Sequence, residues 1–356
     1  MANVTYYLGA GASAGRRNDR GWILEGLPVV NEITNRIMDY INNIKNAKFP
    51  DNISAWKNPQ FGLTSLAAWE NGRQRLLSYL NLLYDACRRN ATIDTYAKKL
   101  VLQDKQAELE QLERMLSFYF ILEQVILPPD SRYDTFLANI LQDRRQFPQN
   151  IKVLSWNYDS QFEIAYHEYD KDHQLKIGSK MASRYEAFDI LKINGSASFR
   201  STESIPQYRN TLLSKIQKNE EKYDPFGEVK LFDILLPDIV FLFKLFVGEI
   251  NPLRENNTNL SFAFDYNRPS DVLYQRSDEI IRSTDVLVII GYTFPFFNRV
   301  IDRRILAPLN PHATIYIQDL HPERIQQSLQ AVCPDMLDAQ IHLRSDVDQF
   351  FLPPEL

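Results

Sequence analysis

The chain has 356 residues, a formal net charge of −5 and a hydrophobic fraction of 44%, which is the composition of an ordinary globular protein. Without a basic surplus it is not expected to bind nucleic acid directly, and its two widely separated cysteines exclude a disulfide framework and a cysteine-only zinc site. The most apolar run, 234–247, contains Pro237, Asp238 and Lys244 and is too short to span a bilayer, so we expect a cytoplasmic protein without membrane contact.

The first fifteen residues predict a strand that runs straight into a turn of small residues. Residues 4–7 read Val-Thr-Tyr-Tyr, and residues 9–14 fit G-x-G-x-x-A, the spacing of a dinucleotide-binding turn. In such a turn Gly11 lets a pyrophosphate approach the backbone, and Ser13 can cap the next helix or donate to a phosphate. The motif alone also fits a tight turn in any α/β protein. A standard dehydrogenase fits poorly, because Glu25, near the expected acidic position, falls in a predicted loop.

Helical periodicity dominates the next part of the chain. Isoleucines at helical spacing predict a helix over 30–46, and the pattern from 63 to 127 is almost wholly helical. A pair of prolines ends this block, and a short helix is predicted over 134–145. We interpret about 30–150 as a large helical insertion that packs on a nucleotide-binding fold or forms an oligomer contact.

Strand and helix patterns alternate from residue 151 onward. Strands are predicted over 151–155, 189–193, 285–290, 313–317 and 340–343. A second insertion, about 199–283, is less readable; its aromatic run at 241–246 is interpreted as core rather than as an interface. Alternating elements with near-continuous apolar strands predict a doubly wound, mostly parallel, Rossmann-like α/β sheet, in a single domain over 1–356.

Small and polar residues follow each predicted strand. They are Gly9, Gly11 and Ser13 after the first, Asn157 and Asp159 after the second, Asn194, Gly195 and Ser196 after the third, Gly291, Tyr292 and Thr293 after the fourth, and Asp319 after the fifth. Because ligands of open parallel sheets bind outside the carboxyl ends of the strands, we predict one binding site built from these turns.

These turns carry a family resemblance. Gly-Ala-Gly-Ala-Ser at 9–13, Trp-Asn-Tyr-Asp at 156–159, Asn-Gly-Ser at 194–196 and Gly-Tyr-Thr-Phe-Pro at 291–295 occur in the order found in sirtuin-like proteins. The chain most resembles the bacterial sirtuin-like NAD hydrolases of anti-phage defence. The motifs cover the sheet at both ends of the chain but neither insertion.

The resemblance implies that NAD⁺ is bound as a substrate. The residues implied in its binding are Gly9, Ala10, Gly11, Ala12 and Ser13 at the pyrophosphate, Asp159 at the nicotinamide end, Gly195 and Ser196 beside it, and Gly291, Thr293 and Asp319 toward the adenosine half. Asn157 would lie by the nicotinamide ribose, where its amide can place a water for attack on an oxocarbenium-like ribose. The alternative for Asn157 is a turn residue that caps the next helix.

Two features depart from the sirtuin pattern. Asn194 stands where that pattern has the histidine that acts as general base, and asparagine cannot take up a proton near neutral pH. The four-cysteine zinc module is absent, so no metal is expected. Protein deacylation is therefore not expected, whereas NAD⁺ hydrolysis could survive in slower form, with Asn157 and Asn194 as the catalytic pair.

Two functions follow as hypotheses. The first is an NAD⁺ glycohydrolase that releases nicotinamide and ADP-ribose, acting as a bacterial anti-phage effector that depletes NAD⁺ and assembling as a homo-oligomer. The second is a weak or inactive NAD⁺- or ADP-ribose-binding sensor, or a scaffold subunit of a defence complex, with a partner ATPase as one possible neighbour.

Overall fold

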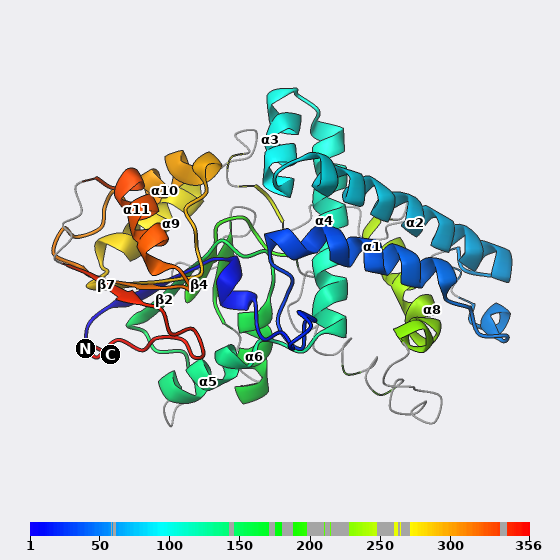
Figure 1. Ribbon diagram of the computed structural model, residues 1–356, viewed down its shortest axis with the longest axis horizontal. Helices are drawn as coiled ribbons and strands as arrows, with labels where there is room; N and C mark the ends of the chain where they lie inside the picture. The colour runs from blue at the N-terminus through cyan, green and yellow to red at the C-terminus, as the bar shows by residue number, and fades with distance from the viewer. Residues whose placement is uncertain are drawn as a thin grey trace. The chain divides into compact units, whose positions relative to one another are not determined.

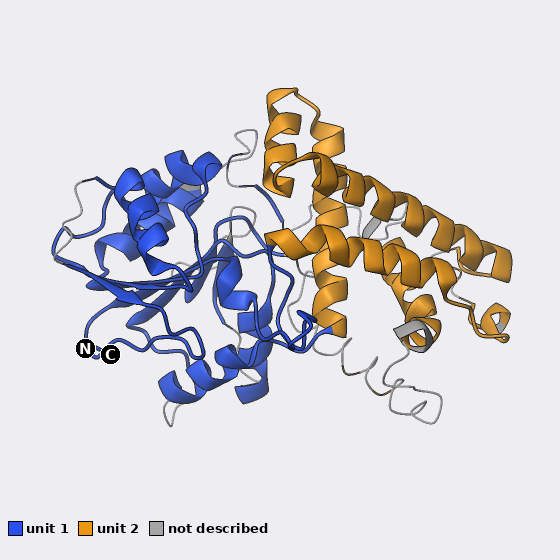
Figure 2. Cartoon of the chain, in the orientation of Figure 1, with its two compact units in different colours: residues 1–29, 127–196, 259–356 blue, residues 30–126, 197–258 orange. Residues whose placement is uncertain are grey.

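The structure is a computed structural model. It describes residues 1–57, 59, 62–141, 146–170, 175–179, 188–197, 210, 214, 228–247, 260–262, 264, 271–334 and 340–356. The chain divides into two compact units (Figure 2). The sheet unit comprises Met1–Val29, Leu127–Ser196 and Asn259–Leu356, and the helical unit comprises Val30–Ile126 and Ala197–Thr258.

The sheet unit is built on seven strands that all run parallel, in the order β3-β4-β2-β1-β5-β6-β7. They are β1 (Val4–Leu8), β2 (Ile151–Ser155), β3 (Ile177–Ser179), β4 (Ile190–Lys192), β5 (Val286–Ile290), β6 (Thr314–Gln318) and β7 (Ile341–Arg344). The predicted doubly wound, Rossmann-like parallel sheet is thereby confirmed. The three-residue β3 was not predicted, because a short segment with a central glycine carries no strand signal.

Helices cover both faces of this sheet. Figure 1 shows α5 (Ser131–Ile140) and α6 (Gln161–Tyr169) below the sheet, and α9 (Asp271–Arg282), α10 (Arg299–Leu306) and α11 (Pro322–Val332) above it. Two short 3₁₀ helices, η1 (Ala10–Ser13) and η5 (Phe296–Asn298), follow β1 and β5. Because parallel strands buried on both faces need no polar side, β1 and β5 are buried at every position.

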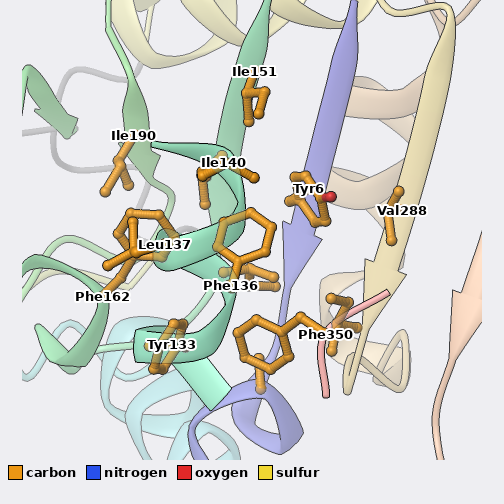
Figure 3. Close-up of a cluster of buried hydrophobic side chains, with 14 of the residues drawn as sticks. Tyr6, Tyr133, Phe136, Leu137, Ile140, Ile151, Phe162, Ile190, Val288 and Phe350 are labelled. Atoms are coloured by element: carbon orange, nitrogen blue, oxygen red, sulfur yellow. The ribbon is translucent and has the colours of Figure 1, made fainter. Parts of the chain in front are cut away.

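Successive side chains of β1 serve opposite faces of the sheet. Tyr6 packs on the α5–α6 side, with its ring 4.9 Å from that of Phe136 (Figure 3). Tyr133 and Phe350 extend this aromatic core, with ring centroids 4.9 Å apart. Tyr7 points to the other side, where its hydroxyl meets Asp302 of α10. The central strand β1 therefore contacts the helices on both faces of the sheet, through residues close to its carboxyl end.

The helical unit contains α1 (Val30–Asn46), η2 (Ile53–Ala55), α2 (Leu66–Arg89), α3 (Ile93–Leu102), α4 (Gln106–Ile126) and α8 (Glu228–Val247). The isoleucine stripe that predicted α1 is buried, at Ile33, Ile37, Ile41 and Ile44. Phe243 of the aromatic run lies in the core of this unit, where it contacts Tyr79 and Phe118. Within the described ranges, no helix is both long and apolar enough to cross a membrane.

The division into units differs from the predicted insertions. The helical unit's first segment ends at Ile126, and residues 127–150 belong with the sheet, since α5 supplies Tyr133 and Phe136 to the sheet core. The helix predicted over 134–145 corresponds to α5, which covers Ser131–Ile140. Residues 142–145, the last four of the predicted range, lie outside the described residues. Much of 199–283 also lies outside them; α8 belongs to the helical unit and α9 to the sheet unit.

Candidate functional site

The polar turns predicted from the sequence lie along one edge of the sheet. The carboxyl ends of β4, β2, β1, β5 and β6 are neighbours in this order. The turns over 193–196, 156–160, 9–13, 291–293 and 318–319 therefore form a row at that edge, where open parallel sheets bind ligands.

Backbone contact explains the glycines that follow β1 and β5. A Cβ on Gly9 would lie 2.5 Å from the carbonyl oxygen of Gly291, and one on Gly11 would lie 2.8 Å from the Cα of Gly291. Gly291 has a φ of +60°, and a Cβ there would lie 2.5 Å from the Cα of Gly11. Residue 11 is therefore a glycine because the turn after β5 packs against it. The sequence motif had indicated another reason, the close approach of a pyrophosphate.

The same packing uses the backbone donors of the glycine turn. The N–H of Gly9 donates to the carbonyl of Ile290 at 3.0 Å, and that of Gly11 donates to Gly291 at 3.0 Å. Ala12 donates within the turn to Gly9 at 2.9 Å. These three groups are not free to hold a phosphate, which leaves Ala10, the exposed residue of the turn, as a backbone donor for one.

The glycine turn meets the turn after β2 through Ser13 and Asn157. The Asn157 Nδ2 donates to the Ser13 Oγ at 3.1 Å, and the Ser13 Oγ also hydrogen-bonds the Tyr133 hydroxyl at 2.9 Å. Both side chains are buried, Ser13 at 2% and Asn157 at 7% exposure. The helix-capping alternative goes to another residue, because it is the Asp159 Oδ1 that accepts from the N–H of Gln161, the first residue of α6.

The turn after β4 packs against the turn after β2. The Asn194 Nδ2 donates to the carbonyl of Trp156 at 3.3 Å, and the Ser196 and Ser160 hydroxyls lie 3.1 Å apart. Gly195 has a φ of +70°, the left-handed region that favours glycine. Ser13, Asn157, Asn194 and Ser196 thus belong to one chain of contacts across three turns.

A buried ion pair lies beneath these turns, and the sequence reasoning missed it. Lys192 of β4 and Glu163 of α6 are 3% and 4% exposed, and the Lys192 Nζ lies 3.0 Å from the Glu163 Oε1. The Lys192 Nζ also donates to the backbone carbonyl of Asp159. Burial raises the pKa of Glu163, and the lysine opposes this rise. The signal in the sequence was a lysine inside an otherwise apolar strand.

A second group of residues that the sequence analysis did not identify fixes the backbone of the glycine turn. The Arg132 Nη2 donates to the carbonyl of Gly11 at 2.9 Å and pairs with the buried Asp130 at 2.6 Å. Asp130 in turn accepts from the N–H of Gly15 at 2.7 Å. Gln161 donates to the carbonyl of Ser13 at 3.0 Å. The turn therefore has its shape fixed before any ligand arrives.

Comparison with known proteins adds no assignment. No protein-family model matches the chain, and no curated protein matches it. The residues themselves therefore carry the functional argument.

Two predicted residues stand apart from the chain of contacts. Thr293 is exposed, and Asp319 is half-buried, with its Oδ1 accepting from the N–H of His321 at 2.9 Å. In the part of the chain that the structure describes, no hydrogen bond joins either side chain to the turns after β1, β2 or β4. Both still lie at the same edge of the sheet, after β5 and β6.

The described residues of the site offer carboxamides, hydroxyls and carboxylates. Among the described residues, no group of three His, Cys, Asp or Glu side chains could hold a metal ion. The amide nitrogen of Asn157 donates to the Ser13 Oγ, so the carbonyl oxygen is the acceptor that this side chain offers. Such a group can accept a hydrogen bond from a sugar hydroxyl or a water, and it cannot take a proton.

Proposed function

We propose that this protein binds NAD⁺ at the carboxyl edge of its sheet and hydrolyses the bond between nicotinamide and ribose. The carbon–nitrogen bond at C1′ breaks, and nicotinamide leaves with the electron pair. The oxygen of a water then bonds to C1′, and its proton passes to solvent, which leaves ADP-ribose. The observation that carries the proposal is the Ser13–Asn157 hydrogen bond, which fixes the Asn157 carboxamide beside the glycine turn.

The proposed chemistry suits a site without a general base. Nicotinamide leaves as a neutral group, so the transition state requires a stabilised, positively charged ribose and a well-placed water rather than a proton acceptor. Asn157 would place the water through its carbonyl oxygen, and Asn194 would contact the ribose. General base catalysis typically contributes about 10²- to 10⁴-fold, so turnover slower by a factor of that order is expected for a site with Asn194 in the base position.

The wider role rests on the resemblance to the bacterial sirtuin-like defence hydrolases. On that basis we propose a cytoplasmic effector that depletes NAD⁺ during phage infection and assembles as a homo-oligomer, with an ATPase or another defence subunit as a candidate partner. A trigger would then raise a low basal rate of hydrolysis, since constant rapid NAD⁺ depletion would harm the cell that makes it.

Nicotinamide release tests the proposal. The purified full chain is incubated with NAD⁺, and free nicotinamide is quantified over time by chromatography. The parent is expected to release nicotinamide and Asn157→Ala to lose this activity. Asn150→Ala is a matched control, because Asn150 precedes β2, at the opposite end of the strand from Asn157, and its amide hydrogen-bonds Ala2. Equal activity in Asn157→Ala and the parent would refute the assignment of the site.

A second candidate function is an NAD⁺- or ADP-ribose-binding sensor or scaffold. It is favoured by Asn194, whose side chain cannot act as a base and donates instead to the Trp156 carbonyl. Under this reading the parent binds ADP-ribose in calorimetry but releases no nicotinamide. Release by Asn194→His would then mean that the site is intact and has lost only its base.

A further inference from the structure

We propose that Asp302, on α10, is a positioning residue for both candidate catalytic asparagines, and that it acts through Tyr7 and Trp156. The inference rests on the proposed function, because it concerns the same site. It joins residues from β1, the turn after β2 and α10, which are far apart in the sequence and meet only in the fold.

The first link is the carboxylate of Asp302. This side chain is fully buried and accepts a hydrogen bond from the Tyr7 hydroxyl at 2.8 Å. It also accepts from the Tyr292 hydroxyl, at 3.1 Å to each oxygen. The Tyr292 hydroxyl in turn accepts from the Asn298 Nδ2 at 3.1 Å. A buried carboxylate with two hydroxyl donors has its orientation fixed.

The second link runs from Tyr7 to Trp156. The single hydroxyl proton of Tyr7 goes to Asp302, so its oxygen is left to accept, and the Trp156 Nε1 donates to it at 2.8 Å. The Tyr292 ring stacks on the Trp156 ring at 5.2 Å between centroids, with an interplanar angle of 9°. The indole is therefore held at its nitrogen by Tyr7 and across its face by Tyr292.

The third link runs from Trp156 to the two asparagines. The backbone carbonyl of Trp156 accepts from the Asn194 Nδ2 at 3.3 Å. Asn157 is the next residue in the chain, and its amide reaches the Ser13 Oγ at 3.1 Å. A shift of Trp156 would therefore displace both carboxamides at once.

The protonation state of Asp302 decides how firmly the links hold. Burial raises the pKa of Asp302 to about 7, and the hydrogen bonds from Tyr7 and Tyr292 oppose that rise. The titratable groups that face this network are Tyr7 of β1, Tyr292 after β5 and Cys333 after α11. A protonated carboxyl is itself a donor and accepts more weakly from Tyr7. The links are therefore tightest above about pH 7, where Asp302 is ionised.

The test reads the two side-chain amides directly and needs no turnover. The full chain is labelled with ¹⁵N-asparagine, and the Nδ2 signals of Asn157 and Asn194 are assigned from their alanine variants. Asp302→Asn, Tyr7→Phe and Trp156→Phe are compared with the parent at pH 8. Tyr292→Phe is the matched control, because it removes a hydroxyl from the same carboxylate but keeps the ring stacked on Trp156 and the hydrogen bond from Trp156 to Tyr7.

The expected result is a shift of both amide signals in the three variants on the path, and a smaller shift in Tyr292→Phe, which keeps the hydrogen bond from Tyr7 to Asp302. In the parent, both signals titrate with a midpoint near pH 7, and in Asp302→Asn they do not. If Tyr7→Phe fails to fold, Trp156→Phe carries the same comparison, since it removes the donor of the hydrogen bond to Tyr7 and keeps an aromatic ring. Signals that stay in place in Trp156→Phe, or that do not titrate in the parent, would overturn the inference.

Kinetics separate this inference from the proposed function. With NAD⁺ as the probe, Tyr7→Phe is expected to lower kcat by about 10- to 100-fold and to leave KM near the parent value, because misplacing a catalytic group by about 1 Å has effects of that order. A parent that releases no nicotinamide refutes the hydrolase, while the amide signals still decide the positioning role. An active parent with an equally active Tyr7→Phe refutes the positioning role alone.

Discussion

Breaking the buried pair Lys192–Glu163 from each side separately should have unequal effects. Glu163→Gln leaves the ammonium of Lys192 buried without its counter-charge, in a strand that is central to the site. Lys192→Met leaves Glu163 buried, but a carboxylate can neutralise itself by taking up a proton. Because burial already raises the pKa of Glu163, and the lysine opposes this, removing the lysine raises that pKa further.

The geometry gives the magnitudes. Two unit charges 3.0 Å apart attract by about 5.5 kcal/mol at an effective dielectric constant of about 20. Desolvation of two ions costs several kcal/mol each, so the intact pair contributes little net stability, whereas removal of one partner costs about 3–5 kcal/mol. The double variant loses both charges and leaves the Asp159 carbonyl without its donor, at a cost of about 1–3 kcal/mol.

The assay is hydrogen exchange of peptides that cover β4 and α6, at pH 5 and pH 8, which gives the free energy of opening for this part of the sheet unit. Glu163→Gln should lose about 3–5 kcal/mol at both pH values. Lys192→Met should lose less free energy of opening at pH 5 than at pH 8. The raised pKa of Glu163 lets its carboxyl stay protonated in the folded state at pH 5, and this stabilisation is lost as the pH rises and the carboxyl ionises. Additive costs in the double variant, or a cost of Lys192→Met that is equal at both pH values, would refute this reasoning.

Further predictions concern Asp302 and the glycines. Because the pKa of Asp302 rises from 3.8 to about 7 on folding, its ionisation destabilises the fold as pH rises through that window. Asp302→Asn should therefore gain stability relative to the parent between pH 4 and pH 8, by up to about 4 kcal/mol in urea unfolding; a constant difference would contradict this. Gly291→Ala should lower the thermal midpoint far more than Gly21→Ala. Both glycines have positive φ, but a Cβ on Gly291 lies 2.5 Å from Gly11, whereas a Cβ on Gly21 meets nothing within 4 Å. Equal decreases of the thermal midpoint would show that the positive φ alone, and not contact with Gly11, accounts for the need for glycine at position 291.

Elements with a local periodic signal were predictable from the sequence. The isoleucine spacing predicted α1 with the bounds that the structure has, and the apolar runs predicted β1, β2 and β5 to within a residue or two. The parallel sheet and the edge at which its polar turns gather followed from the alternation of these elements. The positions of Asn157 and Asn194 along the sheet edge were predictable for the same reason.

Contacts between distant segments were not predictable. Nothing local in the sequence joins Tyr7, Trp156 and Asp302, because their meeting depends on the strand order and on which face each strand residue serves. The role of the glycines was misinterpreted for a related reason. Gly11 fits a phosphate-binding motif, yet its missing Cβ is explained by Gly291, a residue of a turn that the motif does not include. One sequence pattern can thus satisfy two different steric demands.

The central position of β1 has a consequence for how the protein is made. Val4–Leu8 pairs with Ile151–Ser155 on one side and Val286–Ile290 on the other, so the ribosome exposes this apolar segment well before either neighbour exists. At about 5–20 residues per second, the second neighbour follows after roughly 15 seconds to a minute. The helices over 30–126 can form in that interval from local contacts, whereas the strand must wait. Newly made chains are therefore exposed to aggregation through β1 in particular, and chaperones that shield the first residues would raise the yield of folded protein.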